Sequence, residues 1–61
     1  MFLEITKIDT FLEYYRKFGR YIKTVGDNGL SAYNEKGEEI GFINLAIKGK
    51  ANKGFFIIPS V

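Results

Sequence analysis

Residues 30–42 read LSAYNEKGEEIGF, in which two runs with alternating apolar residues flank a polar turn. The central NEKG has the composition of a type I turn closed by a glycine bulge, which is a frequent connection in β-hairpins. A turn at this position places Ala32 opposite Ile40 and Leu30 opposite Phe42. The stretch therefore predicts two antiparallel strands that share one apolar face.

The residues immediately upstream predict a second hairpin that shares a strand with the first. Residues 25–30 read VGDNGL and contain Asn28-Gly29. Asn-Gly is the commonest pair in two-residue type I′ turns, because both residues tolerate a positive φ. With that turn Val25 lies opposite Ala32, so the predicted apolar face extends over three strands.

A short amphipathic helix is predicted further upstream, over residues 10–18. Thr10 and Glu13 have the T-x-x-E spacing of a capping box, in which two side chains satisfy free backbone N–H groups at a helix start. Gly19 is predicted to end the helix as a left-handed C-cap. The apolar residues that fall on one side of this helix are Ile8, Phe11, Leu12, Tyr15 and Phe18.

The two ends of the chain predict further strands. Residues 2–8, FLEITKI, are rich in β-branched and aromatic residues, and 54–61, GFFIIPSV, form a last strand that Pro59 ends or moves to a sheet edge. A polar loop over 48–54 precedes the last strand. The predicted fold class is α+β, with one short helix packed on a small antiparallel sheet of four or five strands in the order β-α-β-β-β-β. We expect residues 1–61 to form a single domain.

Strands 41–47 and 55–58 carry apolar residues on both sides of the chain. One short helix covers only part of one face of such a sheet. At about 25 cal/mol per Å², leaving several such side chains in water costs a large share of the stability of so short a chain. We therefore expect a surface for self-association or for a partner protein, with a closed, barrel-like monomer as the alternative. The residues expected at this surface are Tyr14, Tyr21, Tyr33, Ile43, Leu45, Ile47, Phe55 and Ile57.

The basic residues fall in two groups along the chain, which raises a second hypothesis. Tyrosine beside lysine and arginine suits single-stranded nucleic acid, through base stacking and phosphate neutralisation. The residues that would serve this role are Arg20, Tyr21, Lys23, Lys48, Lys50 and Lys53. The net charge is only +2 and no RNP, KH or helix-turn-helix pattern is present, so nucleic-acid binding is the alternative function.

Catalysis and metal binding are not expected. The chain has no cysteine and no histidine, so it lacks a thiolate nucleophile, an imidazole base and the commonest zinc ligands. The glutamates of the 34–39 turn are typical of a solvated surface. We expect no catalytic, cofactor-binding or metal-binding residues.

The size and composition together favour a small non-catalytic module that binds another protein, with a homodimer as the expected assembly. Such chains are typical of phage-type accessory modulators or inhibitors. The first residues lack the basic and apolar regions of a secretory signal, and no run is long enough to span a membrane. We expect the protein to act in the cytoplasm, that of the host cell if a phage encodes it.

Overall fold

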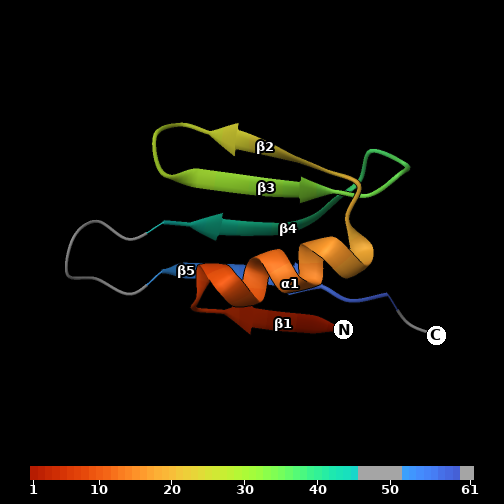
Figure 1. Cartoon of the computed structure of the whole chain (residues 1–61), viewed down its shortest axis with the longest axis horizontal. Coiled ribbons are helices and arrows are strands. Elements are labelled where there is room, and N and C mark those ends of the chain that lie inside the picture. Colours follow the sequence, from red (N-terminus) through yellow and green to blue (C-terminus); the bar gives the residue numbers. More distant parts are fainter. Residues whose placement is uncertain (46–51, 60–61) are drawn as a thin grey trace.

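The protein has two layers, a single helix and an antiparallel sheet (Figure 1). The computed structural model describes residues 1–45 and 52–59. Its elements are β1 (Phe2–Ile5), α1 (Ile8–Phe18), β2 (Tyr21–Val25), β3 (Gly29–Tyr33), β4 (Glu39–Asn44) and β5 (Lys53–Ile57). The five strands lie in the order β1-β5-β4-β3-β2. The predicted α+β class and its β-α-β-β-β-β order are confirmed.

The two ends of the described chain lie side by side in the sheet. The amino group of Met1 donates a hydrogen bond to the Ile58 carbonyl at 2.7 Å, and the Ile58 N–H donates to the Met1 carbonyl at 2.7 Å. β5 therefore runs between β1 and β4, so the predicted alternative of an edge position is wrong. The strand ends at Ile57, shortly before Pro59, as the other alternative predicted. β1 and β2 form two free edges, so the sheet is open and the barrel-like alternative is also wrong.

The helix begins earlier than predicted and without a side-chain cap. It starts at Ile8 after Lys7 in extended conformation, and no side chain caps its first N–H groups, so the predicted capping box at Thr10 is wrong. The earlier start lets Ile8 pack against the core. The helix does end before Gly19, but at φ −93° rather than in the left-handed region. Glycine is needed there because a Cβ atom would lie 2.5 Å from Tyr15 Cδ1.

The first hairpin has a different turn and register from those predicted. Val25 pairs with Gly29 across residues 26–28, and the residue with positive φ is Gly26, at +61°. Gly29 is needed for close packing instead, because a Cβ atom on it would lie 2.7 Å from the Val25 carbonyl oxygen. Ala32 consequently pairs with Ile22. This shift by an odd number of residues places Val25 on the face opposite to Ala32, which corrects the predicted apolar face.

The second hairpin has the predicted turn but acquires a bulge. Gly37 has φ +82°, and its N–H donates to the Asn34 carbonyl at 3.0 Å. Beyond the turn, the register shifts between Ala32 and Tyr33. Ala32 therefore pairs with Gly41 rather than with Ile40. Leu30 likewise pairs with Ile43, so Phe42 points to the opposite face from Leu30.

The core lies between α1 and the strands β1, β5 and β4. Phe11 of the helix and Phe56 of β5 are fully buried and meet edge to face, with 5.6 Å between ring centroids. The other buried apolar residues are Ile5, Ala32 and Ile43. Gly41 makes room for the Phe56 ring, since a Cβ atom on Gly41 would lie 2.5 Å from Phe56 Cδ2. Small residues beside large ones thus allow one helix to seal this face.

Candidate binding face

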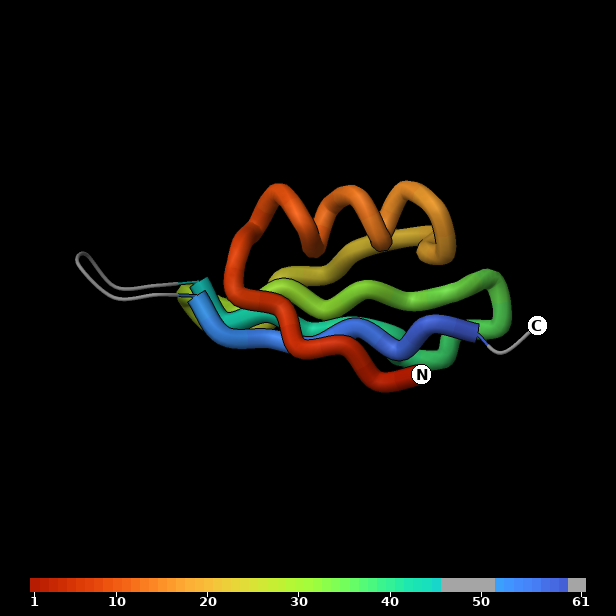
Figure 2. Tube along the Cα trace, turned by 90° about the horizontal axis from the view of Figure 1, so that it is seen from below, coloured from red at the N-terminus to blue at the C-terminus, as the bar shows by residue number. Residues whose placement is uncertain are grey.

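One face of the sheet bears no helix, and we call it the open face. Figure 2 shows α1 on one side of the sheet only, and among residues 1–45 and 52–59 no element covers the other side. Paired residues on neighbouring strands point to the same face, so the strand registers identify its members. They are Phe2, Glu4, Tyr21, Lys23, Val25, Gly29, Ser31, Tyr33, Glu39, Phe42, Asn44, Lys53, Phe55 and Ile57.

Aromatic side chains from all five strands cross the open face, and we call them the aromatic band. Tyr21 of β2 stacks on Tyr33 of β3 with 5.0 Å between ring centroids and 10° between ring planes. Phe42 of β4 lies 6.5 Å from Phe55 of β5. Phe55 in turn stacks on Phe2 of β1 at 5.3 Å. These ring contacts restrict the positions of the aromatic side chains, so the open face has a defined apolar surface.

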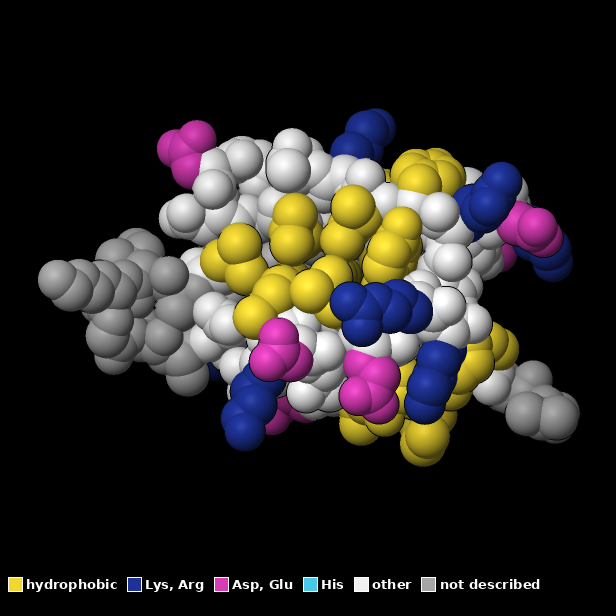
Figure 3. Space-filling view, viewed as in Figure 1, with side chains coloured by type: hydrophobic (Ala, Val, Ile, Leu, Met, Phe, Trp, Pro, Cys, Tyr) yellow, Lys and Arg dark blue, Asp and Glu magenta, His cyan; other side chains and the backbone are white. Residues whose placement is uncertain are grey.

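Most of the exposed apolar surface lies on this face. Phe2 is 67% exposed, Val25 46%, Tyr21 45% and Ile57 43%. Besides Met1 at the N-terminus, which is 72% exposed, the remaining large exposed apolar residue is Ile22 on the helix-bearing face, at 36%. Figure 3 shows that helix-bearing side, where hydrophobic side chains gather beside the helix and charged side chains lie on its outer surface. A concentration of large exposed apolar groups on one face is typical of a protein interaction surface.

Opposite charges stand at the two edges of the open face. One row of paired residues crosses the sheet, and we call it the charged row: Lys23, Ser31, Phe42, Phe55 and Glu4. Lys23 lies on the edge strand β2, where its ammonium nitrogen is 6.0 Å from the Tyr33 ring centroid. Glu4 lies on the other edge strand, β1. Ser31 and Phe42 are buried or half-buried between them.

The structure divides the predicted interface residues between the two faces. Tyr21, Tyr33, Phe55 and Ile57 lie on the open face. Ile43 does not belong to this surface, because it is fully buried under α1, and Leu45 packs against the same core. Tyr14 belongs to α1, where its ring lies 5.9 Å from that of Phe56. Ile47 lies outside the described residues.

Sequence reasoning missed three apolar members of this face, namely Phe2, Val25 and Phe42. Phe2 could have been found from its alternation with Leu3 in the first strand, because Leu3 packs against the core. Val25 and Phe42 were assigned to the core face through the incorrect hairpin registers. The strand register therefore decides which side chains belong to this face, and a register error moves a residue to the opposite face.

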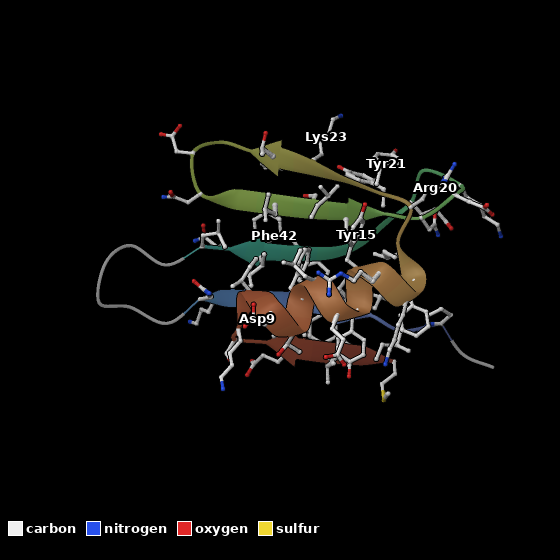
Figure 4. The ribbon with its side chains drawn as sticks, viewed as in Figure 1. Asp9, Tyr15, Arg20, Tyr21, Lys23 and Phe42 are labelled. Carbon is white, nitrogen blue, oxygen red and sulfur yellow. The ribbon has the colours of Figure 1, made fainter. Side chains whose placement is uncertain are left out.

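The residues predicted to bind nucleic acid are spread over the sheet. Arg20, Tyr21 and Lys23 follow one another from the end of α1 into β2 (Figure 4). Lys53 begins β5 and pairs with Asn44, at the end of the sheet away from Arg20. Lys48 and Lys50 lie outside the described residues. The described basic residues thus line one edge and one distant corner rather than a single patch.

Other kinds of site find little support in the described residues. No group of three or more acidic side chains among them could hold a metal ion. An open pocket of about 320 Å³ lies at the C-terminal end of α1, lined by Lys17, Phe18, Gly19, Arg20, Asn34, Glu35 and Lys36. Its charged side chains are exposed. Within the described part of the chain, no helix has the length and hydrophobicity to cross a lipid bilayer.

The fold and this face define a small α+β protein with one sheet face sealed by a helix and the other bearing an aromatic band. No family model, curated protein or solved structure matches the chain. Its function has to be inferred from the geometry of the open face.

Proposed function

We propose that this protein is a non-catalytic module that binds another protein through its open face. The observation that carries this proposal is the aromatic band, which is flanked by apolar side chains that are exposed by two fifths or more, such as Ile57 and Val25. Covering such groups stabilises a complex by about 25 cal/mol for each Å² of apolar surface removed from water. A module of this kind acts by occupying a surface, as a modulator or inhibitor does.

The packing of the rings favours a protein partner over a nucleic acid. Base stacking requires a free ring face. Tyr33 is stacked on one side by Tyr21 and has the Lys23 ammonium 6.0 Å from its centroid. Phe55 is stacked by Phe2. Tyr33 and Phe55 thus each have one ring face already occupied, and their ring edges suit the interdigitating side chains of a second protein surface.

Single-stranded nucleic acid is the second candidate ligand, favoured by the exposed Tyr21 beside Arg20 and Lys23. Phosphate contacts from such residues make affinity fall steeply as salt rises, whereas an apolar protein interface is much less sensitive.

The first prediction concerns capture of a partner from an extract of the cells that encode the protein. Tyr21→Ser removes a ring from the open face and is expected to reduce the captured protein at least about tenfold, because aromatic residues dominate interface energetics. The neighbouring substitution Ile22→Ser alters the opposite face and is the matched control, for which we expect unchanged capture. The captured protein is then purified and titrated against both variants. Equal loss of binding in the two variants would contradict the proposal.

The second prediction separates the two ligand classes. A fluorescent single-stranded oligonucleotide, titrated at about 50 mM and about 200 mM salt, is expected to show no binding that depends on Lys23. The comparison uses the wild-type protein, Lys23→Ala on the open face and Lys17→Ala on the outer surface of α1. Tight binding at low salt that is lost in Lys23→Ala and retained in Lys17→Ala would favour the nucleic-acid function instead.

A further inference from the structure

We infer that the open face binds a second copy of this chain, with the two sheets packed face to face about a two-fold axis that runs parallel to β4. The inference rests on the proposed function, because it names the partner of the same face. The observation behind this inference is the order in which charged and exposed apolar side chains lie across the sheet.

The first observation is the symmetry of the charged row about the central strand. Phe42 lies at its centre on β4, and Lys23 and Glu4 lie two strands away on opposite sides. The strand order places β2 and β1 at the two edges. The row therefore has a positive end, an uncharged middle and a negative end.

A two-fold rotation about an axis along β4 exchanges the two edges of the sheet. It brings the partner subunit's Glu4 over Lys23, and the same operation brings the partner subunit's Lys23 over Glu4. A two-fold axis across the strands would instead place each of these charges over its own copy, which is repulsive. Charge complementarity thus selects one of the two symmetric ways in which the faces can meet.

The neighbouring row of the open face is complementary under the same rotation at its four outer positions. It contains Tyr21, Tyr33, Glu39, Ile57 and Phe2 in that order from β2 to β1, and only Glu39, at the exposed start of β4, meets its own copy. Tyr21, 45% exposed, meets the partner subunit's Phe2, which is 67% exposed. Tyr33 meets the partner subunit's Ile57. Three of the large exposed apolar residues, Phe2, Tyr21 and Ile57, are therefore covered by aromatic or apolar side chains of the partner subunit.

The angle at which packed sheets cross still allows Lys23 of one subunit to reach Glu4 of the partner subunit. Sheets that pack face to face cross at about 30°, which displaces residues two strands from the axis by roughly 5 Å. The long side chain of Lys23 spans such a displacement. Near the axis, where Phe42 and Phe55 lie, the displacement is much smaller.

The size of the face indicates a reversible dimer. Strands about 4.8 Å apart and residues about 3.3 Å apart give a five-stranded face of roughly 20 by 17 Å. Two such faces bury on the order of 1,000 Å² in total once side-chain relief is included, which is at the lower end of specific interfaces. We therefore expect monomer and dimer to exchange with concentration.

The test is sedimentation equilibrium over a concentration series with charge-exchanged variants. Wild type is expected to dimerise reversibly. Glu4→Lys and Lys23→Glu are each expected to weaken the dimer by about tenfold or more, since both symmetric pairs become repulsive. An equimolar mixture of the two single variants, and the double variant E4K/K23E, are expected to regain dimerisation, since every pair is again complementary. Glu13→Lys on the outer surface of α1 is the matched control and should leave the dimer unchanged.

Each outcome decides the inference. A wild type that stays monomeric at millimolar concentration overturns the second copy as partner, whereas the proposed function still stands if Tyr21→Ser loses capture of another protein. A dimer that is insensitive to both charge reversals overturns the face-to-face arrangement and indicates pairing through a free edge of the sheet, that of β1 or that of β2. Dimerisation that is lost in the single variants and regained in their mixture supports the inference.

Discussion

Phe56→Ala is expected to leave the chain largely unfolded at 25 °C. Phe56 is fully buried and packs against the rings of Phe11 and Tyr14, at 5.6 Å and 5.9 Å between centroids. Truncating a buried phenylalanine lowers the free energy of unfolding by about 3–5 kcal/mol. A chain of 61 residues has roughly 3–9 kcal/mol in total. The measurement is thermal and urea unfolding, followed by circular dichroism at a concentration where the protein is monomeric.

The neighbouring residue provides the matched control for this substitution. Phe55→Ala removes the same number of atoms one position earlier in β5, but on the open face, where Phe55 is half-buried. We expect it to lower the free energy of unfolding of the monomer by about 1–2 kcal/mol, through the lost contacts with Phe2 and Phe42. An equal loss of stability in Phe55→Ala and Phe56→Ala would contradict the assignment of Phe56 to the core under α1 and of Phe55 to the open face.

Local signals in the sequence predicted the elements of the fold well. The apolar stripe of α1 was identified from its spacing, and all five of its residues pack in or against the core. The turn closed by Gly37 was predicted from the NEKG composition and is confirmed by its positive φ. These features depend on residues a few positions apart, so a single sequence contains the information.

Strand registers and distant strand pairings were not predictable in the same way. Gly29 was interpreted as a turn residue, although its role is to leave room for the Val25 carbonyl and the Phe42 ring. The bulge beside Tyr33 shifts the remainder of β3 against β4 by one residue. The pairing of β1 with β5 joins residues 49 to 55 positions apart. Each depends on contacts that form only when the whole sheet assembles.

The candidate site was anticipated as a property of the chain but not residue by residue. The expectation of more apolar surface than one helix covers agrees with the exposed groups of the open face. The apolar segments 41–47 and 55–58 cannot be assigned to the binding face as a whole, because alternate residues of a strand point to opposite faces. In β4, Ile43 therefore belongs to the core, and Phe42 beside it belongs to the aromatic band.

Gly54→Ala is expected to destabilise the fold by about 3 kcal/mol or more, although alanine is favoured over glycine in an unstrained strand by about 0.4–1 kcal/mol. Gly54 lies in β5 between Ile5 of β1 and Ile43 of β4. A Cβ atom on Gly54 would overlap the Phe42 carbonyl oxygen and lie 2.6 Å from Ile43 Cα. Both obstacles are backbone atoms of the adjacent central strand, so β4 and β5 would have to separate. The shift of the urea midpoint measures the effect.

A second glycine tests whether the obstacle is backbone or side chain. At Gly41 the added Cβ atom would meet the Phe56 ring, 2.5 Å from Cδ2. Phe56→Leu removes part of that ring, so Gly41→Ala should cost less in the Phe56→Leu background than in wild type, by about 1 kcal/mol in a double-mutant cycle. No such relief is expected for Gly54→Ala combined with Phe42→Leu, because the Phe42 carbonyl remains in place whatever its side chain. Relief of Gly54→Ala by a smaller residue at position 42 would show that side-chain crowding, rather than the close approach of β4 and β5, makes Gly54 necessary.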